Sequence, residues 1–189
     1  MRKFILLAFF GTFISSGIIA QKFEVFNTSN SPIPFNTIKA LSIDSRGWLW
    51  LANENSGNFP HVGWYNGSAW NSYLTTDLVD GVASDTKGDV YFSTSAREIL
   101  RYHDGSWYTQ GSIFLKSSII NPLYCDHNNI LWMGKTSSYY ALLKYNEISW
   151  TEYSSLTTGF PASSVECFQD VGENLWIGTN THGLVKWTS

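Results

Sequence analysis

Hydrophobic and polar residues alternate in short segments along the chain, and these segments recur with a nearly constant period. Each copy contains an apolar segment that ends at an Asp, a short turn, and a second segment centred on an aromatic residue. Short alternating segments bounded by turn residues predict β-strands. The repeated Asp is Asp44, Asp85, Asp126 or Asp170, at intervals of 41, 41 and 44 residues. Repeats of this length built of short strands are typical of propeller blades, so the pattern predicts an all-β, four-bladed β-propeller.

Turn residues divide each copy into four predicted strands. In the turn before the second strand, Gly47 and Gly88 supply a positive φ, and Asn129 takes this role in the third copy. The repeated Asp is expected to accept hydrogen bonds from that turn. Because the aromatic positions repeat, we expect them to pack between blades or over outer strands. Their residues are Trp50, Tyr91, Trp132 and Trp176 in the second strand, Tyr65, Tyr102 and Tyr145 at the end of the third, and Trp70, Trp107 and Trp150 at the start of the fourth.

The last copy stops where its fourth strand is expected to begin, and a matching segment lies at the other end of the chain. Residues 23–26 have the aromatic spacing of residues 150–153, and both segments lie eight residues before a proline. We therefore expect residues 23–26 to pair with the last blade and close the ring, which would leave no exposed strand edge. Four blades form either a closed monomeric ring, which we favour, or half of an eight-bladed ring made by a homodimer.

One irregularity distinguishes the fourth copy. Five positions separate Val165 from Asp170, whereas six separate Ile38 from Asp44 in the first copy. The last blade is therefore expected to lack a residue in its first strand or to contain a β-bulge there.

The first twenty residues have the features of a secretory signal peptide. Arg2 and Lys3 precede an apolar run over residues 4–14, and small residues lead to Ala20. The apolar run is too short to span a bilayer. We expect cleavage near Ala20, which leaves residues 21–189 as a single exported domain, periplasmic or extracellular, with no membrane span.

The net charge limits the kinds of partner to expect, and the cysteine content limits the possible disulfides. The chain has 12 basic and 15 acidic residues, and removing the leader makes the net charge about −5, so nucleic acid is not an expected partner. Cys125 and Cys167 are the two cysteines and fall on the first strands of adjacent blades. A disulfide between them is one alternative in an oxidising compartment, but free thiols are favoured.

The segment Asn174–Leu184, NLWIGTNTHGL, resembles the two-component regulator propeller repeat, whose blades read roughly D-x-x-G-x-L-W-I-G-T-x-x-G-G-L. Residues 44–51 and 126–134 match its first half, and residues 91–94 form a weaker copy. In that family the propellers usually form the periplasmic sensor part of hybrid histidine kinases of Bacteroidetes, often tied to polysaccharide use. The resemblance implies an exported propeller with a sensing or binding role. The sequence contains no kinase or receiver region, so phosphotransfer within it is not expected.

A propeller places its connections between second and third strands on the same face as the connections between blades. These are the long, variable segments of this chain, so a ligand is expected on this long-loop face. Aromatic and amide side chains there suit sugar recognition, although polar residues are common in any surface loop. The candidate ligand-binding residues are Asn53, Asn55, Asn58, Phe59, His61, Arg97, Glu98, Lys135, Tyr139, Tyr140, Asn180 and His182.

The sequence offers little for metal binding or catalysis. The four histidines are scattered, without the spacing of metal ligands, so neither a metal site nor a cofactor is expected. No nucleophile lies beside a base and no carboxylate pair stands out, so no catalytic residue is assigned. The predicted function is a non-catalytic binding or sensing module for a glycan or an envelope protein. The alternatives are a structural scaffold in the cell envelope and, with less support, a lyase or hydrolase.

Overall fold

The structure is a computed structural model that describes residues 23–53, 61–112, 120–135, 142–156, 158–161 and 164–188. These residues form strands and connections and contain no helix. The predicted signal peptide lies outside the described residues. So do the candidate ligand-binding residues Asn55, Asn58, Phe59, Tyr139 and Tyr140.

The described strands form four antiparallel sheets, each a meander in chain order, as the sequence predicts. Blade 1 consists of β1 (Ala40–Ile43), β2 (Leu49–Ala52), β3 (Val62–Tyr65) and β4 (Trp70–Tyr73). Blade 2 consists of β5 (Val79–Ser84), β6 (Val90–Thr94), β7 (Glu98–His103) and β8 (Ser106–Ser112). Blade 3 consists of β9 (Ile120–Cys125), β10 (Leu131–Lys135), β11 (Leu142–Tyr145) and β12 (Trp150–Tyr153). Blade 4 consists of β13 (Val165–Val171), β14 (Asn174–Thr179) and β15 (Leu184–Thr188). The all-β, four-bladed propeller arrangement is therefore confirmed.

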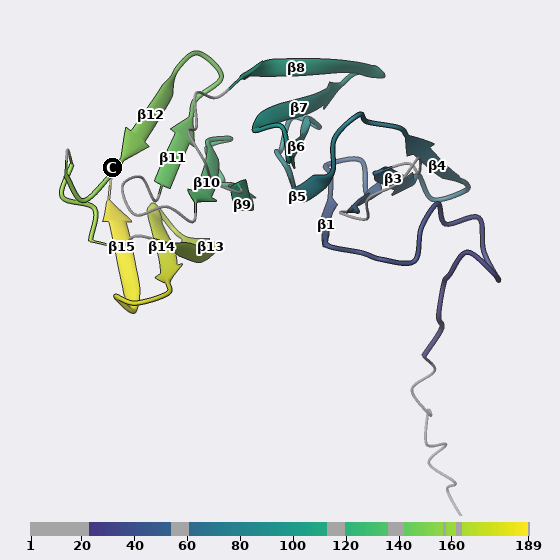
Figure 1. The fold of residues 1–189 in the computed structure, drawn as a ribbon, viewed down its shortest axis with the longest axis horizontal. Coiled ribbons are helices and arrows are strands. Elements are labelled where there is room, and N and C mark those ends of the chain that lie inside the picture. Colours follow the sequence, from purple (N-terminus) through teal and green to yellow (C-terminus); the bar gives the residue numbers. More distant parts are fainter. Residues whose placement is uncertain are drawn as a thin grey trace, which may run out of the picture.

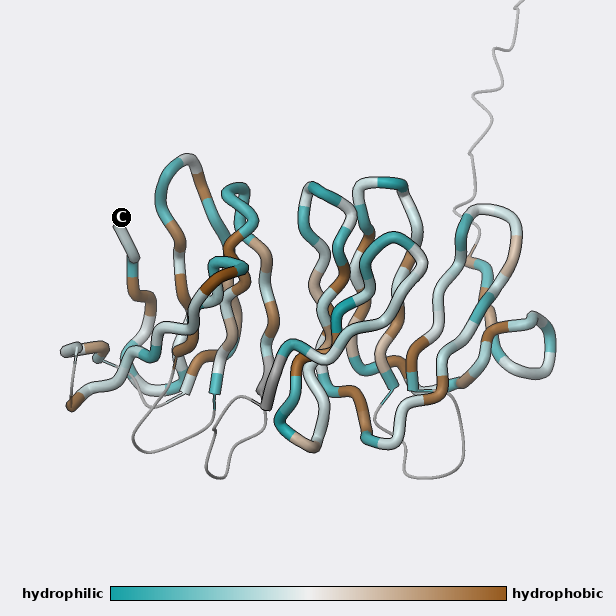
Figure 2. Tube along the Cα trace, turned by 90° about the horizontal axis from the view of Figure 1, so that it is seen from above, coloured by the Kyte–Doolittle hydropathy of each residue, from teal (hydrophilic) through white to brown (hydrophobic). Residues whose placement is uncertain are grey.

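The blades are arranged around an axis, with the first strand of each blade on the inner side (Figure 1). The inner strand β1 packs on β5, β5 on β9, and β9 on β13, so each blade contacts the next one along the chain. Blades 1 and 4 lie at the two ends of the resulting arc (Figure 1). Short hydrophilic hairpin turns lie along one edge, at the top of Figure 2, and we call this edge the tight-turn face.

The core consists of side chains packed between consecutive blades. We call the side of a blade that faces the preceding blade its front face, and the opposite side its back face. On the back face of blade 1, the Trp50 ring lies 4.8 Å from Tyr102 and 6.2 Å from Trp107 on the front face of blade 2. Trp132 of blade 3 meets Trp187 of blade 4 in the same way, at 5.6 Å. The repeated aromatic residues thus bind one blade to the next.

The strand predicted to close the last blade is not formed. Residues 23–26 form no strand, Phe23, Val25 and Phe26 are exposed, and blade 4 has three strands. The segment that follows packs on the front face of blade 1 instead, where Ile33 and Phe35 are buried against Leu51. The lack of a side chain at Gly63 makes room for Pro34, since a Cβ there would lie 2.7 Å from the Pro34 Cγ. Burial of this apolar face explains where the segment lies.

The turn between the first two strands of a blade has the geometry that the sequence predicts. Gly47, Gly88 and Asn129 have φ values of +79°, +95° and +60°. In blade 1, the Oδ1 atom of Asp44 accepts hydrogen bonds from the backbone N–H groups of Arg46 (2.9 Å) and Trp48 (3.0 Å). Asp85 and Asp126 make the same two backbone contacts in their blades. The repeated Asp therefore fixes the turn from within.

Blade 4 departs from this pattern at Asp170. Its turn is one residue shorter, because Val171 pairs directly with Asn174, and Asp170 pairs with Leu175. Asp170 thereby takes the strand position that Ile43 has in blade 1, where Ile43 pairs with Leu49. The missing residue noted in the sequence thus shortens the turn. A register shift also occurs at the start of β13, and similar shifts occur in blades 2 and 3.

Neither cysteine forms a disulfide. Cys125 packs with the front face of blade 3, in the core shared with blade 2. Cys167 pairs with Gly178 and is exposed on the back face of blade 4. The two thiols lie on faces that point in opposite directions, so they cannot meet.

Candidate functional site

A pocket of about 190 Å³ opens on the long-loop face between blades 1 and 2. One wall is the end of β4 with the connection to blade 2, and the other comes from the facing ends of β6, β7 and β8. The lining residues are Tyr73, Leu74, Thr75, Thr76, Asp77, Thr94, Glu98, Leu100 and Thr109. The site is therefore assembled from residues of two blades.

A buried histidine holds the first wall in place. His61 lies directly before β3 and is buried, and its Nδ1 atom lies 3.2 Å from the carbonyl oxygen of Thr75 and 3.0 Å from its Oγ1 atom. The Thr75 hydroxyl donates in turn to the carbonyl oxygen of Asp77 at 2.5 Å. These contacts fix residues 75–77 in one arrangement, so this wall is preorganised.

The second wall is fixed by the turn between β6 and β7. The Arg97 N–H donates to the carbonyl oxygen of Thr94 at 2.9 Å, and Arg97 adopts a positive φ of +67°. Ser95 and Leu78 join the two walls, since the Ser95 N–H donates to the Leu78 carbonyl oxygen at 2.9 Å and the Leu78 N–H donates to the Ser95 Oγ atom at 3.2 Å. These two bonds continue the β5–β6 pairing within blade 2, so the connection that forms the first wall is anchored directly beside the second wall.

The lining chemistry combines hydroxyl groups, carboxylates and one aromatic ring. Tyr73 is held by stacking on Trp107, with ring centroids 4.1 Å apart and 11° between the planes. Asp77 and Glu98 give the pocket two acceptor groups and negative charge. A neutral ligand with many hydroxyl groups fits this set, whereas an anion would be repelled.

The structure distributes the predicted site residues over several places. Glu98 lines the pocket, Arg97 is exposed beside it, and His61 lies beneath its wall. Asn180 and His182 are exposed on the β14–β15 connection of blade 4. The sequence interpretation overlooked residues 75–77, whose only signal is a polar Thr-Thr-Asp run in the connection between two blades.

Two further predicted loop residues are buried. Asn53 donates its N–H to the His61 carbonyl oxygen at 2.9 Å and so supports the same region. Lys135 is buried at the end of β10, with its Nζ atom 3.9 Å from a carboxylate oxygen of Glu152. Burial lowers the Lys135 pKa, and the nearby Glu152 charge opposes that shift.

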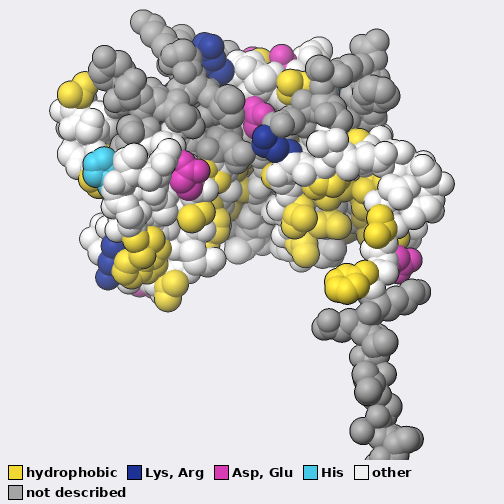
Figure 3. Space-filling view, turned by 60° about the horizontal axis from the view of Figure 1, so that its bottom comes forward, with side chains coloured by type: hydrophobic (Ala, Val, Ile, Leu, Met, Phe, Trp, Pro, Cys, Tyr) yellow, Lys and Arg dark blue, Asp and Glu magenta, His cyan; other side chains and the backbone are white. Residues whose placement is uncertain are grey.

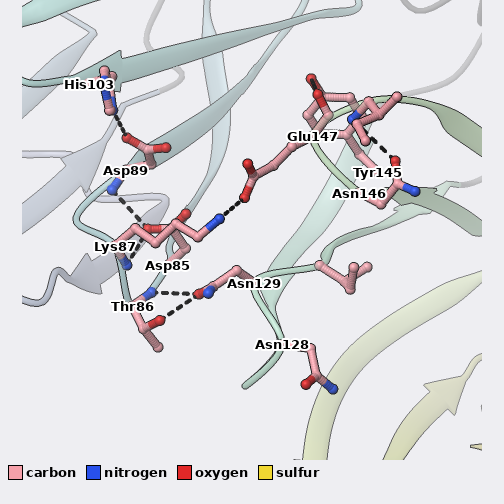
Figure 4. Close-up of polar contacts among 12 residues, drawn as sticks. Asp85, Thr86, Lys87, Asp89, His103, Asn128, Asn129, Tyr145, Asn146 and Glu147 are labelled. Atoms are coloured by element: carbon pink, nitrogen blue, oxygen red, sulfur yellow. Dashed lines mark hydrogen bonds and ion pairs between the residues drawn. The ribbon is translucent and has the colours of Figure 1, made fainter.

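The tight-turn face carries a series of polar contacts between neighbouring blades. Between blades 2 and 3, the Thr86 N–H and hydroxyl both donate to the Oδ1 atom of Asn129, at 2.9 and 2.7 Å, and Lys87 forms an ion pair with Glu147 (Figure 4). Between blades 1 and 2, the Arg46 guanidinium donates to the Gly88 carbonyl oxygen at 3.2 Å. These contacts hold the blades together at their turns.

Between blades 3 and 4 the corresponding contact centres on Asp170. It accepts hydrogen bonds from the Tyr124 hydroxyl, the His127 N–H (2.9 Å) and the His127 Nδ1 atom (2.6 Å). Burial opposes ionisation of Asp170, but these hydrogen bonds outweigh it and lower its pKa, while Asp170 raises the pKa of His127. A cavity of about 60 Å³ adjoins this contact.

Within the described part of the chain, no group of three or more His, Cys, Asp or Glu side chains is arranged to hold a metal ion. A search of the same residues for a helix long and apolar enough to cross a membrane finds none.

The fold and the blade junctions define a β-propeller, and solved structures show the same arrangement. The extracellular domain of BT3049, assigned as a hybrid two-component system of B. thetaiotaomicron, is 17% identical, with a TM-score of 0.66 over 89% of this chain and 24% of that chain. YCF48 bound to D1 peptide is 13% identical, with a TM-score of 0.62 over 80% of this chain and 51% of that chain. Virginiamycin B lyase from Staphylococcus aureus is 18% identical, with a TM-score of 0.59 over 83% of this chain and 57% of that chain.

These similarities establish the fold. The extracellular domain of BT4673 from the same Bacteroides species is a further match, with a TM-score of 0.65, so the expected resemblance to two-component propellers is confirmed in three dimensions. No protein-family model and no curated protein sequence matches the chain. The chain spans about a quarter of the Bacteroides domains and about half of the other two proteins.

Proposed function

We propose that this chain is an exported, non-catalytic propeller module that binds a glycan in the pocket between blades 1 and 2. The observation that carries the proposal is the lining of that pocket. Threonine hydroxyls and the carboxylates of Asp77 and Glu98 surround apolar surface from Tyr73 and Leu74. Sugar hydroxyls hydrogen-bond to such groups, and the apolar face of a pyranose packs on an aromatic ring.

Two further observations support a binding role. Both walls of the pocket are fixed by hydrogen bonds within the protein, so a ligand would lose little affinity to ordering of the site. The extracellular domains of the Bacteroides two-component systems have the same fold. The long-loop face in which the pocket opens is also the face on which the sequence predicts a ligand.

The experiment is a thermal-shift screen of the purified protein against plant and host oligosaccharides, followed by calorimetry on each hit. A ligand at a hundred times its dissociation constant adds about 2.7 kcal/mol, which raises the melting temperature by roughly 5–10 °C in a domain of this size. We expect Asp77→Asn and Glu98→Gln each to weaken binding at least about tenfold, because a charged hydrogen-bond acceptor is worth about 1.5–3 kcal/mol. Asp104→Asn, an exposed change on the tight-turn face, is the matched control.

Each outcome decides between functions. A hit that Asp104→Asn weakens as much as Glu98→Gln does would place the ligand elsewhere. Silence across the panel would contradict glycan binding and favour a protein partner. Because Asp77 and Glu98 line one pocket, each hit is also incubated with the protein and assayed for new reducing or unsaturated ends. Their appearance would contradict the non-catalytic assignment, since a carboxylate pair is the catalytic apparatus of glycosidases.

A further inference from the structure

The front face of blade 1 exposes apolar side chains that are buried at the same repeat position in other blades. Leu41 is 63% exposed, whereas Val82 and Leu123, which lie 41 and 82 residues later, are 6% and 9% exposed. Ile38 is 39% exposed, whereas Val79, at the same position in blade 2, is fully buried. The difference arises because blades 2 and 3 each pack behind another blade, whereas the described residues form no blade in front of blade 1.

The back face of blade 4 shows the complementary exposure. The repeated aromatic residues of blades 1 to 3 are at most 2% exposed, because each is covered by the next blade. Trp176 has the same position in blade 4 but remains partly exposed. Its ring lies 5.6 Å from the Nζ atom of Lys186, just as Trp132 lies 5.3 Å from Lys144 in blade 3. In blade 3 this pair is covered by Trp187 of blade 4, and in blade 4 the equivalent pair faces solvent.

These two faces are therefore the two halves of one type of interface. Each internal junction joins the back face of one blade to the front face of the next, and the chain presents an unused back face at one end of the arc and an unused front face at the other (Figure 1). Figure 3 shows hydrophobic side chains gathered over blade 1, and others beside a basic side chain over blade 4. Exposed apolar surface of this kind marks an interaction site.

The strand count shows the same complementarity. Blade 4 has no fourth strand, so the outer edge of β15 is unpaired among the described residues. Residues 23–26 pair with no strand among the described residues. The last of them, Phe26, lies seven residues before Ile33, and Tyr153 at the end of β12 likewise lies seven residues before Phe160. Ile33 and Phe160 are both buried on the front face of the blade that follows them. Residues 23–26 thus have the place of an outer strand belonging to a blade in front of blade 1.

We propose that two copies of this chain associate head to tail, with the back face of blade 4 of each copy on the front face of blade 1 of the other. Residues 23–26 of each copy then add the fourth strand to blade 4 of its partner. The chain's own blade 4 lies at the far end of the arc, so a second copy is the occupant that supplies this face without rearranging the fold. Two such interfaces related by a twofold axis close a ring of eight blades.

A cysteine cross-link tests this geometry at one point. In the junction between blades 3 and 4, a Cβ placed on Gly134 would lie 3.0 Å from the Cβ of Val165. The equivalent positions in the proposed interface are Gly178, which pairs with Cys167, and Ile38 of the partner copy. Ile38→Cys with Cys167→Ser is mixed with a tagged chain that keeps Ile38 and Cys167. We expect an oxidised product of twice the chain mass, which disappears when Cys167→Ser is present in both chains.

Solution mass tests the interface as a whole. Light scattering on the unmodified protein is expected to give twice the chain mass. Leu41→Glu, which would bury a charge in the interface, and deletion of residues 23–26 are each expected to reduce it to one chain mass while the circular dichroism spectrum is retained. Ile148→Glu is the control, because Ile148 is 90% exposed on the β11–β12 turn, away from both end faces.

The outcomes separate the alternatives. A single-chain mass for the unmodified protein, with no cross-link, would overturn the proposal. The single variant Ile38→Cys keeps Cys167 in the same chain. If this variant has a single-chain mass and forms a disulfide within the chain, the ring is closed by the chain's own two ends, and the proposal is overturned. Loss of the dimer in Ile148→Glu as well as in Leu41→Glu would show association through another surface.

Discussion

The repeated Asp gives a sharp test of the structural argument, because the same substitution is predicted to destabilise the protein in one blade and not in the next. In blade 1 both carboxylate oxygens of Asp44 are used. Oδ1 accepts from the turn backbone, and Oδ2 accepts from the Trp50 indole N–H at 2.9 Å and from Arg46. In blade 2 the aromatic residue is Tyr91, which has no indole, and the buried Oδ2 atom of Asp85 accepts no hydrogen bond from any described residue.

Asparagine has one carbonyl oxygen, so it can replace one acceptor but not two. Asp44→Asn must leave either the turn amides or the buried indole N–H unpaired. We expect a loss of about 2–3 kcal/mol in the free energy of unfolding, since hydrogen bonds to charged groups contribute about 1.5–3 kcal/mol and an unpaired buried donor costs a similar amount. Asp126→Asn should lose about 1–3 kcal/mol for the same reason, because Trp132 donates to Asp126 at 2.8 Å.

Asp85→Asn should not lower the free energy of unfolding. The Asn carbonyl can still accept from the N–H groups of Lys87 (2.9 Å) and Asp89 (2.8 Å), and the substitution removes a buried negative charge. Burial, and then the Asp89 charge, outweigh the backbone hydrogen bonds and raise the pKa of Asp85. We expect the variant to be equal in stability to the unmodified protein or more stable by up to about 1 kcal/mol at pH 7.

The pH dependence follows from the two pKa directions. Burial opposes ionisation of Asp44, but hydrogen bonds from Trp50 and Arg46 outweigh it and lower its pKa, so its stabilising effect is present above pH 3.8 and is lost as the pH falls through the folded-state pKa. The Asp85 pKa is raised, so its destabilising effect is present above the folded-state pKa and disappears as the pH falls towards 3.8. The advantage of Asp85→Asn should therefore shrink in acid.

The assay is urea unfolding followed by tryptophan fluorescence and circular dichroism, at pH 7 and pH 4.5, with one protein concentration throughout. Equal losses of stability for Asp44→Asn and Asp85→Asn would refute the reasoning, because they would mean that the second carboxylate oxygen has the same role in both blades.

Three further predictions concern blade junctions and turns. Asn129→Ala should lower the free energy of unfolding by about 1–2 kcal/mol, because alanine is strained at this positive φ and cannot accept the hydrogen bonds from Thr86. Asn129→Gly should lose only the hydrogen bonds, since glycine adopts the positive φ without strain. Urea titrations of both variants separate the two effects. His127→Gln should reduce stability below pH 6.5, because the His127 imidazole is then charged and interacts with Asp170. The difference in stability from the unmodified protein should fade as the pH rises through the raised pKa of His127 in the folded state. Melting temperatures of both proteins from pH 5 to 9 measure the difference. Gly63→Ala should displace residues 33–35 from blade 1, and faster amide exchange in that segment would report the change, while unchanged exchange would contradict the packing described for Pro34.

The sequence by itself determined the fold class, the number of blades and the turn chemistry. These features are local: each depends on a strand pattern, a positive-φ residue or a turn-capping Asp that acts within a few residues. They are also easy to recognise, because the same pattern recurs in each copy of the repeat. Asn129 was predictable as a substitute for glycine for this reason, and its φ of +60° agrees. The resemblance of residues 174–184 to a known propeller repeat was local in the same sense.

Only the tertiary structure decided how the blades are used. Spacing alone made residues 23–26 an outer strand, but it could not say whether the last blade lies within reach, and in this fold blades 1 and 4 lie at opposite ends of an arc. The pocket was equally hidden, because its walls come from separate blades and depend on the buried contact between His61 and Thr75. Contacts between distant parts of the chain depend on the angle between packed sheets, which no short segment of sequence encodes.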